Sequence, residues 1–361
     1  MKFVSDFSFT SAPHRPRADW HPGQVFGIGA LGALCDPSIM SSLFQDSAGA
    51  TPVTAQGQPV GLVRDQSGNG NHAAQATSTK RPYLARYPAG GLRNVAHGSA
   101  AVDNVAYWPA TVLHNGMTST KLASGLDTDG LPFVDIQWTG TPTGTLHQLC
   151  FAVANTRNAA SVGQSWTASA IAKRTGGTLS GVYGLRVDTV EETAPATYVA
   201  AVSGNLASGE VDTISTSTRV IASGNQVRTA ISLSVATGAP IDVTYRVKGL
   251  QLELGSTRTA YQHNMSQYDI TEAGQRDVWA LYNDAVDDAL PVTVPDLGTD
   301  ATIWCATEAG ATITGAQTIG AGSLETLRGT RTVAFGAINR ALTAAETARL
   351  TAYLNRKLAG Y

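Results

Sequence analysis

Short stretches in which apolar and polar residues alternate dominate the chain between about residues 95 and 262. In one of them, Ile231, Leu233 and Val235 alternate with serines. Two more follow, with apolar residues at Val243, Tyr245, Val247, Leu250, Leu252 and Leu254. A period of two with β-branched and aromatic residues is typical of strands that bury one face. Several such strands without helices between them predict an antiparallel sandwich or jelly roll.

The two flanks of this region differ from it and from each other. Residues 23–90 are rich in turn formers, and we expect only a short helix there, over Asp36–Phe44. The last hundred residues contain two predicted strands, Ala301–Cys305 and Thr332–Ile338. They end in a helix, because Thr343–Glu346 has the form of a capping box and apolar residues follow at helical spacing.

Composition narrows the class of protein. At 361 residues the chain is long enough for two or three domains, and its 43% hydrophobic content excludes wholesale disorder. Only 14% of the residues are charged, with a net charge of −2, whereas about 25% is usual in soluble proteins. The basic residues are scattered in pairs, so we expect no nucleic-acid partner.

Cysteines and apolar runs give no sign of disulfides or of a membrane. Cys35, Cys150 and Cys305 are odd in number and far apart, so they imply no disulfide framework. The longest apolar run, Val25–Leu34, is too short for a membrane helix and lies too deep in the chain for a secretory signal. We therefore expect a protein made in the cytoplasm without signal peptide or anchor.

Several segments resemble structural proteins of tailed phages and gene transfer agents. Ser42–Val53 and Val60–His72 are similar to the opening of a laminin-G/concanavalin-like sandwich. Gly249–Gln262 resembles the closing strand of the carbohydrate-binding-module-like jelly roll of phage fibre proteins. Leu281–Asp288 resembles the strand with which such a sandwich resumes, although Ala285 replaces a glycine, and Ala337–Glu346 resembles its terminal segment.

The resemblance implies a mostly β fold with two antiparallel β-sandwich or jelly-roll domains, one inserted in the other, plus a short C-terminal helix. Residues 1–22 would be an N-terminal attachment arm. Residues 23–92 and 266–361 would form the split laminin-G/concanavalin-like sandwich, and 93–265 the inserted jelly roll. The implied protein is a head-spike or tail-fibre component on a phage-like particle, where its partners are capsid, spike-base or tail proteins and further copies of itself.

Carbohydrate binding has the best physical case among the candidate chemistries. Sugar faces stack on aromatic rings, and sugar hydroxyls need polar side chains around them. The inserted domain offers candidates of both kinds, namely Trp108, Trp138, Trp166, Tyr183, Tyr245 and Arg186. Within Val134–Trp138 the period of two puts Trp138 on the face of Val134 and Ile136, and Asp135 and Gln137 on the other. A tryptophan in line with Val and Ile is more often a core residue than a ligand contact.

Catalytic and metal-binding patterns are weaker. A glycosidase needs two carboxylates, and the pairs Asp127/Asp129 and Glu210/Asp212 sit beside turn residues. No histidine stands in a zinc-binding arrangement. Asp65, Asn69 and Asn71 offer oxygen ligands for a weak Ca²⁺ site, with a self-hydrogen-bonded turn as the alternative. We expect no other cofactor.

The sequence therefore predicts a non-enzymatic virion-type protein that binds host surface polysaccharide through many weak sites. We also expect a homo-oligomer, because spikes and fibres are built from a closed ring or a bundle of subunits. Two alternatives stay open. One is a capsule-degrading glycosidase, and the other is a purely structural decoration or adaptor protein that binds no glycan.

Overall fold

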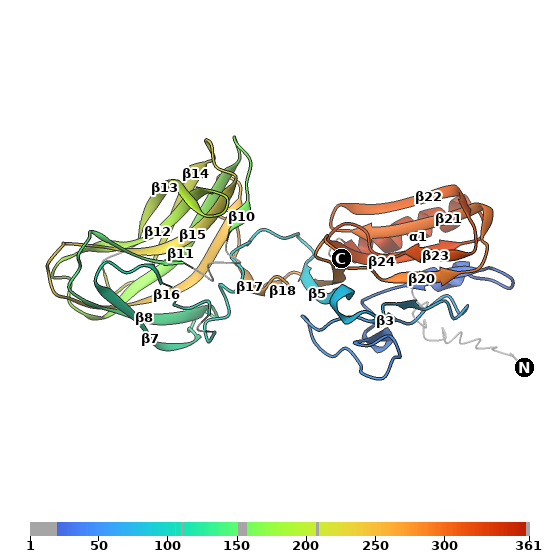
Figure 1. The fold of residues 1–361 in the computed structure, drawn as a ribbon, viewed down its shortest axis with the longest axis horizontal. Helices are drawn as coiled ribbons and strands as arrows, with labels where there is room; N and C mark the ends of the chain where they lie inside the picture. Colours follow the sequence, from blue (N-terminus) through green and yellow to red (C-terminus); the bar gives the residue numbers. More distant parts are fainter. Residues whose placement is uncertain (1–19, 105, 110, 151–156, 207–208, 359–361) are drawn as a thin grey trace, which may run out of the picture.

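The computed structural model describes residues 20–104, 106–109, 111–150, 157–206 and 209–358. The described residues form four β-sheets, in two bodies that lie side by side in Figure 1. All the strand pairs between them are antiparallel except the short contact of β18 with β5. The mostly β fold class with antiparallel sandwiches is confirmed. Most of the predicted arm, 1–19, lies outside the described residues.

One body is built from the continuous stretch 111–254. Its sheet III has the order β13-β12-β15-β9-β6, and β10 also pairs with β15. Its sheet IV has the order β14-β11-β16-β8-β7. The strands of sheet III are β6 (Thr111–Leu113), β9 (Leu146–Cys150), β10 (Asn158–Ala159), β12 (Val182–Thr193), β13 (Thr197–Leu206) and β15 (Gln226–Val235). Those of sheet IV are β7 (Met117–Leu126), β8 (Pro132–Gly140), β11 (Ser165–Gly177), β14 (Thr213–Val220) and β16 (Ile241–Leu254).

The other body combines strands from both ends of the chain. Sheet I has the order β17-β18-β5-β19-β24-β21-β22, with β1 also on β24, and sheet II has the order β2-β3-β4-β20-β23. The strands of sheet I are β1 (Gly32–Cys35), β5 (Tyr83–Pro88), β17 (Gln262–Ser266), β18 (Asp269–Glu272), β19 (Asp277–Tyr282), β21 (Gly298–Thr307), β22 (Gly310–Ile319) and β24 (Arg331–Ile338). Those of sheet II are β2 (Leu43–Phe44), β3 (Leu62–Val63), β4 (Ala73–Ala74), β20 (Pro291–Val294) and β23 (Gly322–Glu325).

Strand pairing bears on the predicted domain boundaries. β17 begins at Gln262 and pairs with β18 of sheet I, so the chain enters the body of sheets I and II just before the predicted 265/266 boundary. The division into 23–92, 93–265 and 266–361 stays a prediction.

Each body has its own apolar core. Between sheets III and IV the core contains Val134, Ile136 and Trp138 from β8, facing Leu185 and Val187 from β12. The predicted alternation of β8 is thus confirmed, because Asp135 and Gln137 are only partly buried and face away from this core. Since apolar side chains alternate with polar ones, every strand of this kind contributes one face to the core.

Helix α1 (Ala344–Leu358) covers sheet I opposite sheet II, and the predicted capping box is confirmed. The Glu346 backbone N–H donates to Thr343 Oγ1 at 3.2 Å, and the Thr343 N–H donates to Glu346 Oε2 at 2.8 Å. Leu350 and Leu354 are buried against Trp304 of sheet I. The ring of Trp304 lies on Gly336, where a Cβ would be 2.2 Å from it.

The helix expected over Asp36–Phe44 is wrong. That segment holds only a 3₁₀ turn before β2, and the described chain contains three such turns, η1 (Pro22–Val25), η2 (Met40–Ser42) and η3 (Ser78–Lys80). Asp36 instead receives hydrogen bonds from the Tyr353 hydroxyl at 2.7 Å and Lys357 Nζ at 2.6 Å, and so ties α1 to the end of β1. The Asp36 carboxylate also accepts the Ser38 backbone N–H at 3.0 Å, so the local turn and the tertiary contact share this side chain.

The two bodies are joined through a network of buried amides, which we call the junction network. Asn94 Nδ2 donates to the Gln262 carbonyl at 2.9 Å, and Asn264 Nδ2 donates to the Asn94 carbonyl at 2.7 Å. The Gln262 N–H donates to Gln251 Oε1 at 2.7 Å. All four side chains are fully buried. Buried amides bonded to each other define one arrangement of the two chain crossings.

Candidate functional site

The aromatic residues expected to contact sugar lie mainly inside the protein. Trp108, Trp138, Trp166 and Tyr245 all belong to the core between sheets III and IV. Their expected role as ligand contacts is wrong, because a ring packed between two sheets presents no face to solvent. The alternation that put Trp138 in line with Val134 and Ile136 also explains why it is buried.

The other two predicted contacts lie on sheet III. Tyr183 is 71% exposed near the start of β12, and Arg186 is partly buried further along that strand. Asp135 and Gln137, the polar partners noted in the sequence, lie on sheet IV instead. The structure therefore does not bring the six predicted residues together into one site.

Sheet IV carries an open polar surface on the side away from the core. Directly paired residues point to the same side of a sheet, and here the pairs are polar: Asp135 with Arg246, and Gln137 with Thr244. This surface, which we call the polar face, consists of Thr118, Thr120, Phe133, Asp135, Gln137, Thr139, Asp242, Thr244 and Arg246. It lies on three adjacent strands, β7, β8 and β16, so its side chains stand on a rigid platform.

Arg246 is the best-ordered group of the polar face. Its Nε and NH2 atoms donate to the two oxygens of Asp135 at 2.8 and 2.9 Å, and NH1 donates to Asp127 at 3.2 Å. The guanidinium carbon lies 3.6 Å from the centre of the Phe133 ring. Hydrogen bonding to Asp135 raises the pKa of Arg246 further. A bidentate, ring-stacked arginine is held in one orientation while its side chain stays 22% exposed.

Lys248 is the centre of a neighbouring cluster, which we call the lysine cluster. Its Nζ lies 2.8 Å from Asp127, 2.8 Å from Asp129 and 2.7 Å from Asp212. The lysine side chain is 2% exposed. Asp212 also lies 3.6 Å from Lys173 at the rim of the cluster.

The lysine cluster bears on the carboxylate pairs considered for catalysis. It brings together Asp127, Asp129 and Asp212, whereas Glu210 pairs with Arg174 at 2.5 Å. The hydrogen bond from Lys248 lowers the pKa of Asp127 to about 2. A glycosidase acid needs a raised pKa so that it carries a proton near neutral pH. Asp127 is ionised there and is suited to accept hydrogen bonds.

The candidate calcium block forms a turn bonded to β1. The Asp65 carboxylate accepts hydrogen bonds from the backbone N–H groups of Leu34, Ser67 and Asn71, at 2.8, 2.9 and 3.0 Å. Asn69 and Asn71 donate their side-chain amides to the Gly32 carbonyl, at 3.2 and 2.8 Å. These contacts correspond to the hydrogen-bonded turn that was the alternative. Calcium binding by this block stays a prediction.

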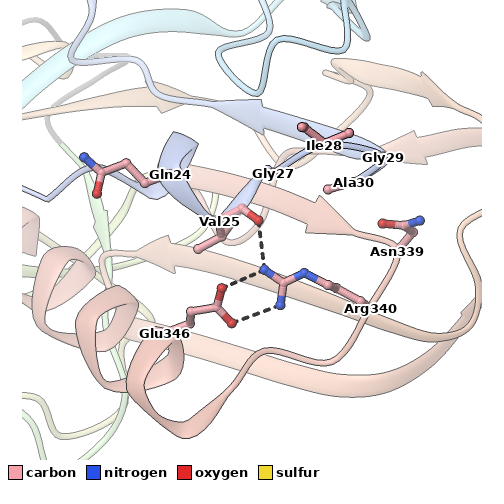
Figure 2. A pocket seen from close by; sticks show the side chains of 9 residues that line it. All are labelled: Gln24, Val25, Gly27, Ile28, Gly29, Ala30, Asn339, Arg340 and Glu346. Atoms are coloured by element: carbon pink, nitrogen blue, oxygen red, sulfur yellow. Dashed lines mark hydrogen bonds and ion pairs between the residues drawn. The ribbon is translucent and has the colours of Figure 1, made fainter.

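A shallow cavity of about 340 Å³ lies between the loop after η1 and the start of α1. Figure 2 shows the Arg340 guanidinium between Glu346 and the Val25 carbonyl, to which it donates at 2.8 Å. Its two bonds to the Glu346 carboxylate are 2.7 and 2.9 Å long. Because these polar groups satisfy each other, they connect α1 to η1 and leave no free charge toward the cavity.

Comparison with known proteins gives distant structural likenesses only. No family model and no curated protein matches the chain. The xylan-binding CBM22-1 domain of Paenibacillus barcinonensis Xyn10C is similar over 46% of this chain and 94% of its own, with 11% identity and a TM-score of 0.27. The N-terminal cellulose-binding domain of Cellulomonas fimi β-1,4-glucanase C covers 40% and 91%, with 16% identity and a TM-score of 0.23. A cyclase from Fischerella sp. TAU covers 49% and 100%, with 11% identity and a TM-score of 0.27.

None of the helices in the described ranges has the length and apolar character needed to cross a bilayer.

Proposed function

We propose that this protein is a non-enzymatic glycan-binding protein, and that the polar face of sheet IV contacts the polysaccharide. The observation that carries the proposal is the Arg246 arrangement, in which a partly exposed guanidinium is fixed by Asp135 and stacked on Phe133. Groups already held in place lose little conformational entropy when a ligand binds. Threonine hydroxyls and the Gln137 amide around Arg246 complement sugar hydroxyls.

The charges on this side of sheet IV favour neutral glycans. The polar face and the lysine cluster together carry five carboxylates against the two cations Arg246 and Lys248, with Lys173 at the rim; the carboxylates belong to Asp127, Asp129, Asp135, Asp212 and Asp242. An excess of negative charge repels uronic acids and other anionic sugars. It leaves carboxylate oxygens that accept hydrogen bonds from neutral hydroxyl groups.

The wider setting of the proposal rests on the sequence resemblance. Segments such as Val60–His72 and Gly249–Gln262 suggest a head spike or fibre on a phage-like particle. There the protein would adsorb the particle to bacterial surface polysaccharide. Several copies in one homo-oligomer would turn weak single contacts into strong attachment.

An array of neutral and uronic-acid-containing bacterial polysaccharides, probed with the full chain, tests the proposal. We expect binding to neutral polysaccharides and its loss in Arg246→Ala. Arg64→Ala is a matched control, because Arg64 also lies over an aromatic ring, 4.4 Å from the centre of Phe44, but in the other body. Shortening of the polysaccharide would establish the glycosidase alternative. Absence of binding to the whole array would favour the structural alternative.

A further inference from the structure

A second concave site lies where the two bodies meet. A cavity of about 590 Å³ is bounded by the β7–β8 loop, by the chain leading into β17 and by the end of β18. Its lining residues are Leu126, Asp129, Gly130, Leu131, Ala260, Tyr261, His263, Thr271, Glu272 and Ala273. We call it the junction pocket. Its volume is in the range of small-molecule sites, which often form between domains.

The walls of the junction pocket are largely apolar. Leu126 is 71% exposed, and Leu131 and Ala260 continue the same surface. The rings of Tyr261 and His263 meet edge to face, with their centres 6.3 Å apart. A large exposed leucine beside aromatic rings in a concave surface is stabilised when an apolar ligand face covers it.

Two ion-paired carboxylates belong to the lining of the pocket. Glu272 accepts hydrogen bonds from Arg93 NH2 at 2.7 Å and Gln262 Nε2 at 2.9 Å. Asp129 is held by Lys248 at 2.8 Å and by the Leu131 N–H at 3.1 Å. The pocket lining contains no lysine or arginine, and burial lowers the pKa of His263, which keeps it neutral at pH 7. The ion-pair partners Arg93 and Lys248 are not part of the lining, so the pocket surface itself offers carboxylate oxygens that accept hydrogen bonds.

Residues outside the pocket position its two carboxylates, and some of these residues also contact the polar face. Gln262, which positions Glu272, belongs to the junction network that joins the two bodies. Asp129 belongs both to the pocket and to the lysine cluster, whose Asp127 also contacts Arg246. The pocket and the polar face are therefore linked by a chain of ion pairs from Asp129 through Lys248 and Asp127 to Arg246.

We propose that the junction pocket is a separate subsite for a single neutral sugar residue with an apolar face, such as a hexose or a deoxyhexose. The ring would cover Leu126 and Tyr261, and its hydroxyls would donate to Asp129 and Glu272. This proposal deepens the proposed function, because a chain bound on the polar face would place an end or a branch in the pocket. The junction-pocket proposal also goes beyond the proposed function, because this subsite needs residues from both bodies.

The test uses the full chain and simple methyl glycosides, which are too small to span both sites. Methyl glucoside, methyl fucoside and methyl glucuronoside are titrated while the ring signals of His263 and Tyr261 are followed by NMR. We expect the neutral glycosides to shift these signals and the glucuronoside to leave them unchanged. Ala273→Trp, which fills the pocket from an exposed position, weakens this binding about tenfold or more.

Two further variants separate the possible failures. Ala260→Trp fills the pocket from the opposite wall, and Ala345→Trp places the same side chain on an exposed position of α1 as a control. Arg246→Ala should keep the methyl glycoside shifts of His263 and Tyr261, since neither Arg246 nor its partner Asp127 lines the pocket. The junction pocket would be overturned if saturating neutral glycoside left the signals of the wild type unchanged. It would also be overturned if Ala273→Trp and Ala260→Trp both showed the same shifts as the wild type. Loss of polysaccharide binding in Arg246→Ala would still support the polar face in that case.

Discussion

The body formed by sheets III and IV contains two networks of arginine–carboxylate ion pairs, which differ in how deeply they are buried. On the polar face, Arg246 is 22% exposed beside Asp135. Near the end of β12 in sheet III, Glu191 is fully buried, pairs with Arg219, and accepts hydrogen bonds from the backbone N–H groups of Ala222, Ser223 and Gly224.

The two networks differ in how many of their polar groups remain accessible to a ligand from solvent. The Glu191 carboxylate is surrounded by donors from its own chain, and its neighbour Glu192 lies between Arg157 and Arg228. Such a network fixes the fold. Groups on the polar face are ordered in the same way but still face solvent. Burial, rather than the presence of an arginine–carboxylate pair, therefore separates the Glu191 network from the proposed recognition surface.

The largest expected effect comes from opening the buried network. Glu191→Ala leaves Arg219 without its buried partner and three N–H groups without an acceptor, which costs about 3–5 kcal/mol of unfolding free energy. Urea unfolding followed by circular dichroism measures the loss. A change below about 1 kcal/mol would show that this network does not differ from a surface pair.

Next in size is the effect of Arg246→Lys on binding. A lysine cannot make the two parallel bonds to Asp135 or stack flat on Phe133, so affinity for a neutral polysaccharide should fall about tenfold. The unfolding free energy should change by only about 1 kcal/mol, because the lysine keeps a positive charge beside Asp135. A stability loss as large as that of Glu191→Ala would make Arg246 a structural residue and remove the contrast.

An acid titration of stability probes the lysine cluster. The pKa of Asp127 is about 2 in the folded protein and about 3.9 in an unfolded chain. A lowered folded pKa gives stability that is present above pH 3.9 and lost as the pH falls toward 2. Urea midpoints between pH 5 and pH 2 should fall less steeply in Asp127→Asn than in the wild type. Parallel curves would show that Lys248 does not hold this carboxylate ionised.

The smallest expected effect is that of Thr343→Ala at the start of α1. Loss of the capping hydrogen bond to the Glu346 N–H costs about 1 kcal/mol. Because the cap is remote from both networks, glycan affinity should not change. Thermal unfolding measures the stability, and a parallel titration measures the glycan affinity. A fall in affinity in Thr343→Ala would mean that general destabilisation also explains the binding losses of the Arg246 variants.

Local sequence patterns predicted the strands and the final helix because those signals are short in range. The alternation in β8 and the Thr343–Glu346 capping box each lie within a few residues. The same alternation put Trp138 in line with Val134 and Ile136, which favoured the core for this ring without excluding a ligand contact. Burial of the whole apolar face decided that question in favour of the core.

The candidate sites depended on contacts between distant residues. Asp127 and Asp212 meet only because strand register places Lys248 between them, and sequence spacing carries no record of that register. The junction pocket needs Leu126 and Glu272 from separate bodies. A usable signal was nevertheless present, since Asp135 and Gln137 were correctly placed on the face of β8 opposite Trp138.

A calorimetric titration of the full chain with a neutral surface polysaccharide, beside Arg246→Ala and Arg64→Ala, tests the central claim most directly. The polar face predicts that the wild type and Arg64→Ala bind with equal affinity, and that Arg246→Ala binds at least about tenfold more weakly with its fold intact. Equal binding by all three proteins would contradict the assignment of the polar face.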